Sequence, residues 1–511
     1  MKNRTLLGVL LLAGLLLTMS CNKDNPAEPS VINVTGKVTD ETTDTPIADV
    51  TVTSGLENTS TGSDGTFTIQ ANKNGLLVFS KEEYKDKNVS VNSQSSIDIT
   101  MTPVDNPLET VVLSGLTKGD MTLTSDKIYE LNQKFVVANG HTVTIEPGTI
   151  IKGREGVGSV ASAFIVARGG KIMAEGTAEN PIVFTSILDN IIPGQKWGDN
   201  LTEIDREKWG GLILLGKAPI SAGDGDTEAQ IEGIPADDDF GRYGGSDPAD
   251  NSGVLKYISI RHGGALIGDG NEINGLTLGG VGNGTTIEYI EVLSNLDDGV
   301  EFFGGTVNVK NIIVTYQADD GIDIDQNYSG TIENVVVIHG GDATDEALEL
   351  DGPEGTANDG LFTIKNGSFI KKGGKGTGGD FKSETQGTIE NSVWIGYGEG
   401  TTLKIRESFD ADNNCADKTD SYDYLVADEP RLILRNNEIV TSASTLDVII
   451  GLYTSSEGCQ NSITTEMQDK VIQVLEGAKN TLVSQPSENI GADFSVFTGW
   501  TWSDNQDLIK Y

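Results

Sequence analysis

An internal repeat constrains the fold of this chain more than any other feature of its sequence. One pattern recurs: an apolar residue, a polar residue, Tyr or Asn, and then an apolar run. The pattern occurs in LKYISI (255–260), IEYIEV (287–292), VKNIIV (309–314), IENVVV (332–337), IKNGSF (364–369) and IENSVW (389–394). Successive copies lie about 22 to 32 residues apart, which is the length of one coil of a parallel β-helix with loops absorbing the variation. The repeat therefore predicts a solenoid of stacked coils.

The third position of the repeat predicts how the coils stack. It is occupied in turn by Tyr257, Tyr289, Asn311, Asn334, Asn366 and Asn391. Asn tolerates the left-handed backbone conformation that a tight bend requires, and its amide can bond the Asn of the next coil. We therefore expect a structural ladder formed by Asn311, Asn334, Asn366 and Asn391.

A second strand repeats in phase with the first. It is present in GVEFF (299–303), GIDID (321–325), ALELD (347–351), DFKSE (380–384) and TLKIR (402–406). Successive side chains of a strand point to opposite faces, so the apolar residues face the core and the residues between them face outward. The first outward column contains Glu301, Asp323, Glu349, Lys382 and Lys404, and the second contains Phe303, Asp325, Asp351, Glu384 and Arg406.

The acidic part of these columns requires neutralisation, because like charges on coils ~4.8 Å apart repel each other. One solution is a hard cation such as Ca²⁺, which takes several carboxylates at once. Its candidate ligands are Glu301, Asp323, Asp325, Glu349 and Asp351, with Asp297-Asp298 and Asp319-Asp320 adding carboxylates at the same edge. The other solution is ion pairing with Lys382, Lys404 and Arg406. The simplest interpretation is a solvated charged face with weak cross-coil ion pairs.

Three early segments resemble the first coils of the pectin-lyase-like β-helix superfamily. They are VTIEPGTIIKG (143–153), GTAENPIVFTS (176–186) and KWGGLILLGKAPI (208–220). The region 271–311 also resembles a group of uncharacterised outer-membrane lipoproteins with this fold, in its blocks NEINGLTLGGVGNGTTIEYIEV and LDDGVEFFGGTVNVKN. The resemblance implies a right-handed parallel β-helix over residues 107–511.

The superfamily resemblance also implies two kinds of chemistry. Polyuronate lyases of this fold hold Ca²⁺ with stacked carboxylates and use a nearby Lys or Arg as the base. The corresponding candidates for substrate binding or proton abstraction are Lys382, Lys404 and Arg406. Hydrolases of this fold use carboxylates as acid and base. The sequence contains no hydrolase-type Gly-His-Gly run, and fold alone does not establish an activity.

The C-terminal region predicts a cap for the last coil. Thr465 and Gln468 fit a capping box, and an apolar helical stripe follows them. The stripe consists of Met467, Val471, Val474, Leu475 and Ala478. We expect this helix to close the last coil together with Phe497, Trp500 and Trp502.

Residues 31–103 form a separate β-rich segment. Val50 and Val52 alternate with Thr at period two, and Ser63-Asp64-Gly65-Thr66 is a hairpin turn signal. The order VTGKVTD…TPIADVTVTS…TGSDGTFTI resembles the carboxypeptidase-regulatory-like family, which implies a small transthyretin-like β-sandwich. The expected fold class is thus all-β: this sandwich, then the β-helix with its C-terminal capping helix.

The N-terminus resembles a lipoprotein signal. Residues 1–20 contain Lys2 and Arg4, an apolar run too short to span a bilayer, and a small residue before Cys21. Cys21 is the predicted lipidation site, and residues 21–30 form a polar tether. Acidic residues after Cys21 resemble a surface-export signal. We therefore expect a lipid-anchored protein of the cell outer membrane.

Composition restricts the partners. The net charge of −40 argues against nucleic acid, since phosphate binding requires clustered Lys and Arg. Cys415 and Cys459 are the cysteines outside the signal, and in an exported protein they predict a disulfide.

The first functional hypothesis is a non-enzymatic lipoprotein that binds a glycan or surface protein along the solenoid. The alternative is a Ca²⁺-dependent polysaccharide lyase or a glycosidase.

Overall fold

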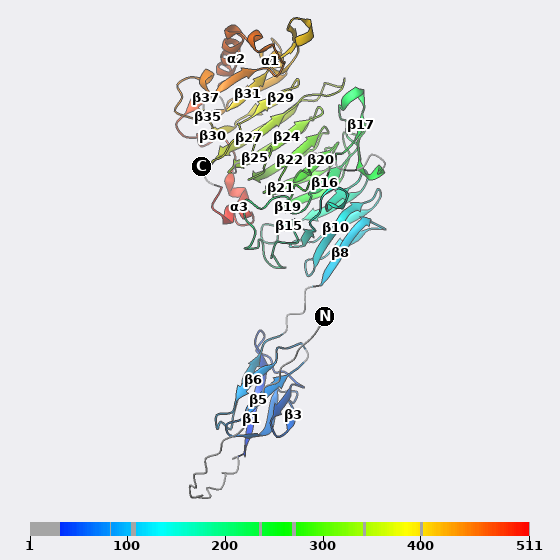
Figure 1. Ribbon diagram of the computed structural model, residues 1–511, viewed down its shortest axis with the longest axis vertical. Coiled ribbons are helices and arrows are strands. Elements are labelled where there is room, and N and C mark those ends of the chain that lie inside the picture. Colours follow the sequence, from blue (N-terminus) through cyan, green and yellow to red (C-terminus); the bar gives the residue numbers. More distant parts are fainter. Residues whose placement is uncertain are drawn as a thin grey trace, which may run out of the picture. The chain divides into compact units, whose positions relative to one another are not determined.

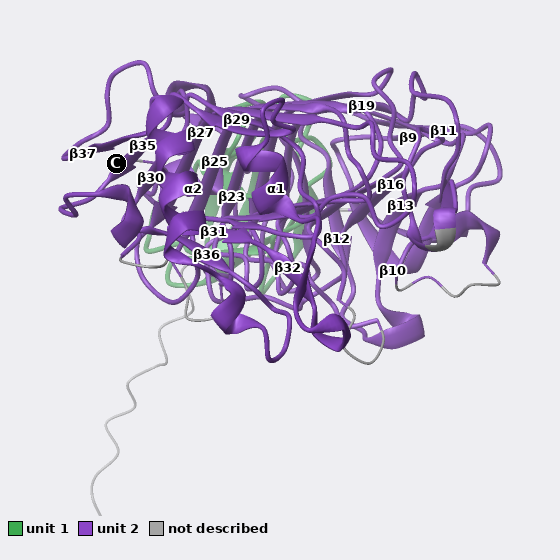
Figure 2. Ribbon diagram, turned by 90° about the horizontal axis from the view of Figure 1, so that it is seen from above, with its two compact units in different colours: residues 1–107 green, residues 108–511 purple. Residues whose placement is uncertain are grey.

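The computed structural model describes residues 31–81, 83–103, 109–232, 234, 238–267, 272–340, 344–398 and 402–509. The chain divides into two compact units, residues 1–107 and 108–511 (Figure 2). The predicted signal, Cys21 and the tether lie outside the described residues. In the part of the chain that is described, no helix has the length and apolar character needed to cross a membrane.

The first unit is a β-sandwich of two sheets. One sheet has the order β4-β1-β7 and the other β3-β2-β5-β6. Its strands are β1 (Val31–Asp40), β2 (Thr51–Ser54), β3 (Asn58–Ser60), β4 (Thr66–Asn72), β5 (Leu76–Ser80), β6 (Lys87–Ser90) and β7 (Ile99–Met101). Alternate residues are buried between the sheets, where Phe67 and Phe79 meet edge to face at 5.3 Å. The predicted sandwich is confirmed.

The second unit is a parallel β-helix, in which strands stack in chain order (Figure 1). Its pairings define three faces. The acid face contains β13 (Ala163–Val166), β16 (Leu212–Leu215), β20 (Leu276–Gly279), β22 (Val300–Phe303), β24 (Ile322–Asp325), β26 (Leu348–Leu350), β28 (Asp380–Phe381), β31 (Leu403–Arg406) and β36 (Ile450–Tyr453). The strap face contains β12 (Ile150–Gly153), β15 (Ile182–Ser186), β30 (Val393–Ile395), β35 (Glu438–Val440) and β37 (Thr481–Val483). The third face contains β9 (Met121–Leu123), β11 (Thr142–Ile145), β14 (Lys171–Glu175), β29 (Gly387–Glu390) and β34 (Leu432–Arg435).

Long strands bend from one face to the next. β19 (Gly253–Arg261), β21 (Thr286–Leu293), β23 (Asn308–Thr315), β25 (Thr331–His339) and β27 (Phe362–Lys371) run from the third face to the strap face. β8 (Thr110–Leu116) and β10 (Ile128–Val137) bend from the strap face to the acid face in the first coils. Inward side chains of all three faces form one continuous hydrophobic core.

Short hairpins and helices lie in the loops between the strands of the coils. The hairpins are β17 (Glu228–Gln230) with β18 (Arg242–Gly244) and β32 (Ser408–Asp410) with β33 (Ala416–Lys418). The 3-10 helices are η1 (Gly158–Val160), η2 (Gly223–Gly225), η3 (Asp239–Gly241), η4 (Ala411–Asn413), η5 (Leu446–Val448), η6 (Gln460–Ser462) and η7 (Phe494–Phe497). The α-helices are α1 (Ser421–Val426), α2 (Thr465–Gly477) and α3 (Trp502–Asn505).

The structure places the Tyr and Asn column at the bend between the third face and the strap face. Every member has a positive φ, between 51° and 61°. Asn334 Nδ2 donates to Asn311 Oδ1 at 2.8 Å, and Asn436 Nδ2 donates to Asn391 Oδ1. Asn436, with a φ of 55°, extends the column by one coil. The repeat pattern does not identify it, because polar Asn437 and Glu438 follow it where most other copies have an apolar run.

The predicted register of the acid face is wrong in one coil. Glu349 pairs with Asp380, and Asp380 pairs with Lys404, so Asp380 stands where Lys382 was expected. The inward Phe381 packs against Leu350. β28 has only two residues, and the following Ser383 and Glu384 adopt positive φ, so the strand ends before Lys382. Lys382 instead lies beside Asp351.

The cap differs in detail from its prediction. The N-cap of α2 is Thr464, whose side chain accepts from Met467 N, not Thr465. Gln468 caps the edge of β36 instead: its Oε1 accepts from Leu452 N and its Nε2 donates to Ile450 O. Val471 and Leu475 are buried against the last coils, as the stripe predicts. α2 therefore closes the solenoid both by apolar contact and by bonding a strand edge.

Residues 484–509, the C-terminal strap, cross the outside of the strap face. Phe497 and Trp500 pack with Ile313, Val336 and Ile370 of the middle coils. The expectation that Phe497, Trp500 and Trp502 close the last coil is therefore wrong. Figure 1 shows α3 in red beside the middle strands, away from α1 and α2.

Candidate metal centre

The predicted acidic column exists, but it is buried rather than solvated. Glu301, Asp323 and Glu349 are direct partners on β22, β24 and β26. Glu301 is 7% exposed and Asp323 is 8% exposed. Their side chains leave the hydrophobic core, yet inserted segments cover them. The predicted solvated face is therefore wrong for the early part of the column.

The β17–β18 hairpin is one of these covering segments. The ring of Tyr243 lies 5.8 Å from that of Phe303, and its hydroxyl donates to Gln326 Oε1 at 3.0 Å. Ile220, Ile234 and Ile273 join Phe303 in a second hydrophobic cluster outside the coil. The hairpin thus excludes water from a surface that a bare solenoid would expose.

A second row of carboxylates lies at the turns that precede the acid-face strands. Asp298 Oδ1 accepts from Asp320 N at 2.9 Å, and Asp320 Oδ1 accepts from Glu346 N one coil later. Glu346 Oε1 in turn accepts from Thr377 Oγ1 at 3.1 Å. Asp298 and Asp320 therefore bond the backbone of the next coil, and Glu346 bonds a side chain of the next coil, which fixes these carboxylates close to the first column.

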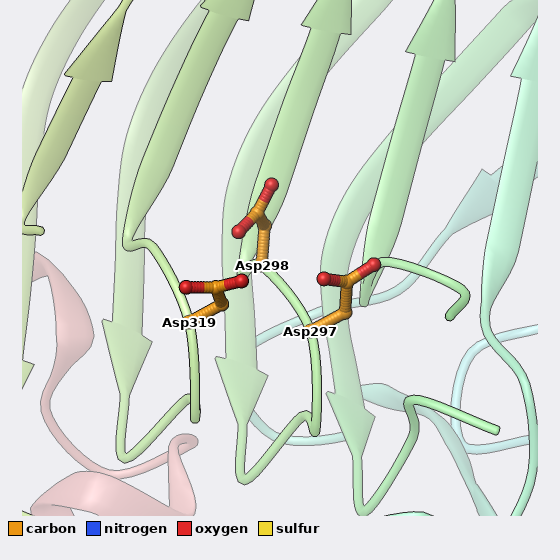
Figure 3. Close-up of side chains that lie close together, drawn as sticks. All are labelled: Asp297, Asp298 and Asp319. Carbon is orange, nitrogen blue, oxygen red and sulfur yellow. The ribbon is translucent and has the colours of Figure 1, made fainter. Parts of the chain in front are cut away.

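The two rows converge into three overlapping groups of carboxylates. The groups are Asp297, Asp298 and Asp319; Asp298, Glu301 and Asp323; and Asp323, Glu349 and Asp351. Within each group one oxygen of every residue lies within 4.8 Å of the others. Figure 3 shows Asp297 and Asp298 on one turn and Asp319 on the neighbouring turn. Ligand oxygens on opposite sides of Ca²⁺ are about 4.6–5.2 Å apart, so each group has the required compactness.

Cationic side chains neutralise only the late end of the column. Lys382 Nζ lies 2.5 Å from Glu349 and 3.2 Å from Asp351. Lys404 Nζ lies 2.6 Å from Glu346, and Arg406 pairs with Asp380. Over the described ranges, no Lys or Arg forms an ion pair with the early carboxylates, which are Asp298, Glu301 and Asp323.

Burial raises the pKa of carboxyls in both parts of the column, including the lysine-paired Glu346 and Asp351. Burial, followed by the field of neighbouring carboxylates, raises the pKa of Asp298, Glu301 and Asp323 well above the usual range. The same causes raise the pKa of Asp297 to about 7 and that of Asp319 to about 6. A set of carboxyls in this state binds either protons or a cation.

Several buried oxygen atoms in this region lack a hydrogen-bond partner. They include Asp323 Oδ1, Asn274 Oδ1 and Asn295 Oδ1. Asn274 Nδ2 donates to Glu301 Oε2, so its oxygen is turned away from that carboxylate. A buried acceptor without a donor is costly unless something else satisfies it. An all-oxygen set with an orphaned carboxylate oxygen fits a hard cation such as Ca²⁺.

The structure brings together four of the five predicted ligands. Glu301, Asp323, Glu349 and Asp351 belong to the compact groups, whereas Asp325 lies outside them. Burial and the neighbouring carboxylates raise the pKa of Asp325 to about 8. The sequence reasoning missed Glu346, although it stands two residues before its strand exactly as Asp298 and Asp320 do.

Cys415 and Cys459 form a disulfide in the cap region, 44 residues apart in sequence. Cys415 follows η4, and Cys459 precedes η6. The bridge therefore ties two loops that lie outside the regular coils, and it does not contribute to the carboxylate groups.

Comparison with known families agrees with both units. The CarboxypepD_reg-like domain matches residues 34–113, and the pectate-lyase like beta helix domain matches residues 115–443. No curated protein and no solved structure matches the chain. The second match spans more than half of the chain, and the stacked parallel strands agree with it. The chain therefore belongs to the family of pectate-lyase-like β-helix domains.

Proposed function

We propose that this chain is a lipid-anchored outer-membrane protein whose β-helix binds Ca²⁺ on its acid face and holds a glycan or surface protein there without catalysis. The two matched domains support a surface or carbohydrate-related protein. The observation that carries the proposal is the buried early carboxylates, which include the orphaned Asp323 Oδ1 and have no cationic partner in the described chain.

The cation is assigned to the groups that share Asp298. The third group, with Glu349 and Asp351, already pairs with Lys382. Asp298, Glu301 and Asp323 form the buried base of the site, and Asp319, which retains access to solvent, marks its outer side. When bound, Ca²⁺ neutralises these carboxylates and offers its outer coordination positions to oxygen atoms of a partner. Approach from the side of Asp319 leaves the covering hairpin in place.

Proton abstraction is not part of the proposal. Lys382, Lys404 and Arg406 each pair with carboxylates, and these carboxylate partners raise the pKa of all three side chains. A general base requires a pKa near the working pH, so ion pairing of this kind works against that role. A panel of polyuronates checks this point: we expect no unsaturated product, and its formation would support the alternative of a lyase.

Calorimetric titration of the metal-free full chain with CaCl₂ tests the cation site. We expect a Kd of about 10⁻⁴ to 10⁻³ M, the range of extracellular calcium modules. Asp323→Asn should weaken binding at least about tenfold, because it removes the orphaned oxygen's charge. Asp359→Asn, the same change at an exposed position, is the matched control and should bind as wild type. Absence of binding by the wild-type chain overturns the site.

The anchor is tested separately. Cys21→Ser should move the protein from the membrane fraction to the soluble fraction, because the acylated thiol is lost. A membrane-bound Cys21→Ser variant would contradict lipidation without affecting the cation site. Proteolysis of whole cells distinguishes a surface-exposed protein from one that faces the periplasm.

A further inference from the structure

A groove of about 1000 Å³ lies between the Tyr and Asn column and the C-terminal strap. Tyr289, Asn311, Asn334 and Asn366 line it from the solenoid, and residues 485–496 line it from the strap. The acid face contributes none of these lining residues. The groove is therefore independent of the proposed cation site, and its size fits a ligand site.

The groove begins where the column changes from Tyr to Asn. The rings of Tyr257 and Tyr289 are stacked, with centroids 4.3 Å apart and planes inclined by 9°. Lys256 approaches Tyr289 from the coil of Tyr257. The next position in the column is Asn311, which has no ring. The coil that follows Tyr289 therefore adds no ring to the stack, and the half-buried Tyr289 lines the groove together with Phe494 and Val496 of the strap.

Oriented amides continue the wall beyond Tyr289. Asn311 is 3% exposed and Asn334 is 6% exposed. Asn334 donates to Asn311 Oδ1 at 2.8 Å, and Asp493 N of the strap donates to Asn334 Oδ1 at 2.6 Å. These bonds hold the amides in one orientation, so the wall is preorganised for a ligand.

The charges around the groove restrict the ligand. Lys310 pairs with Glu333 at 3.5 Å, so its charge is compensated. Two further acidic residues, Glu488 and Asp493, line the groove from the strap. This excess of negative charge disfavours an anionic ligand. An aromatic face next to fixed amides suits a ring with one apolar side and a polar rim.

We propose that this groove binds a neutral pyranose unit of a glycan, with the apolar side of the sugar ring packed against Tyr289. The sugar hydroxyls bond to side chains along the column, with Asn366 the more accessible amide. The strap forms the opposite wall. The site is distinct from the acid face and takes a neutral sugar, not a uronate.

Calorimetry of the full chain with maltohexaose, cellohexaose, xylohexaose and mannohexaose tests the proposal, with trigalacturonate as the anionic comparison. We expect at least one neutral oligosaccharide to bind, and EDTA to leave its affinity unchanged. Tyr289→Ala should weaken that binding at least about tenfold, since the stacking surface is lost. Tyr289→Phe, which keeps the ring, should bind within about twofold of wild type.

A variant that fills the groove with a larger side chain provides a second test. Asn311→Tyr should extend the aromatic stack into the groove and abolish binding, and Tyr257 and Tyr289 already tolerate the required positive φ. Tyr453→Ala changes an exposed tyrosine outside the groove and should bind as wild type. Thermal unfolding confirms that each variant is folded. The proposal is overturned if no neutral probe binds, or if Tyr289→Ala and Asn311→Tyr bind normally.

Discussion

At the scale of single residues, neighbouring carboxylates of one column experience different environments. Asp323 and Glu349 are direct partners on adjacent coils. Glu349 lies 2.5 Å from Lys382, whereas Asp323 is covered and retains an oxygen without a donor. The position in the repeat is the same for both residues. Their difference arises from the loops and from Lys382, which lie outside the repeat itself.

This difference predicts an unusual pH dependence of stability without metal. The pKa values of Asp297, Asp319 and Asp325, about 7, 6 and 8, exceed those of an unfolded chain. Above about pH 4 the unfolded chain releases protons that the folded chain keeps, so stability falls as pH rises. We expect a loss of at least about 2 kcal/mol between about pH 5 and pH 8 in EDTA.

Urea denaturation at several pH values measures this effect. Saturating CaCl₂ should remove most of the decline, because the bound cation stabilises the ionised carboxylates. Asp323→Asn should flatten the profile in EDTA, with Asp359→Asn as the matched control. A stability in EDTA that stays constant or rises across this pH range would contradict the prediction.

At the scale of elements, one buried carboxylate of β21 holds the part of the strap that begins α3. Glu291 accepts from Trp502 N at 3.0 Å and from Ser503 N at 2.9 Å, and it is fully buried. It also accepts from the hydroxyls of Ser503 and Ser259, and it pairs with the buried Arg261. This carboxylate therefore links the start of α3 to the outer surface of the solenoid.

Glu291→Gln should destabilise the protein by roughly 3–5 kcal/mol, because it removes the carboxylate that pairs with the buried Arg261. Glu288→Gln is the matched control on the same strand, where Glu288 is accessible and pairs with Lys256 at 3.4 Å. The control should cost less than about 1 kcal/mol. Urea denaturation compares the two variants, and equal effects would rule out the role given to Glu291.

The cap predicts a second element-scale effect. The Cys415–Cys459 bridge closes a loop of 44 residues. The loop entropy removed from the unfolded chain corresponds to about 4 kcal/mol. The double change Cys415→Ser and Cys459→Ser should lower the free energy of unfolding by roughly 2–4 kcal/mol in urea denaturation. Wild type treated with reductant should match the double variant, and a variant as stable as the oxidised protein would contradict this estimate.

Local signals were sufficient to predict the solenoid and the positive-φ bends of the Asn column. Asn311 and Asn334 occupy bends whose requirement for a positive φ is local, so the repeat carries the information. The position of Lys382 could not be predicted from the repeat, because β28 contains only two residues. The burial of Glu301 could not be predicted from the repeat either, because it depends on the β17–β18 hairpin more than 50 residues earlier in the sequence.

The strap was the least predictable element. Trp500 packs near Tyr257, more than 240 residues away in sequence, and no periodic pattern marks such a contact. The aromatic residues of the strap indicate only that it packs on a surface. The last coil is the part of the solenoid nearest in sequence, so the sequence alone assigns the strap to that coil. Long-range contacts of this kind lie beyond what spacing rules can predict.

At the scale of the whole molecule, the two compact units have separate hydrophobic cores. Separate cores predict two unfolding transitions, because cooperativity requires shared contacts. Differential scanning calorimetry of the full chain should resolve them, and CaCl₂ should raise only the transition of residues 108–511. A single transition that shifts as a whole with CaCl₂ would indicate that the two units unfold together.

The strap also changes how the solenoid responds to mechanical load. A stack in which each coil contacts only its neighbours can be unzipped under tension, one coil after another. Backbone groups of the strap bond to Asn391, Ser368, Asn334 and Glu291 on successive parts of the stack. Force along the stack must therefore shear several of these bonds at once. A protein tethered at one end to a membrane and at the other to a glycan would gain resistance to peeling from this arrangement.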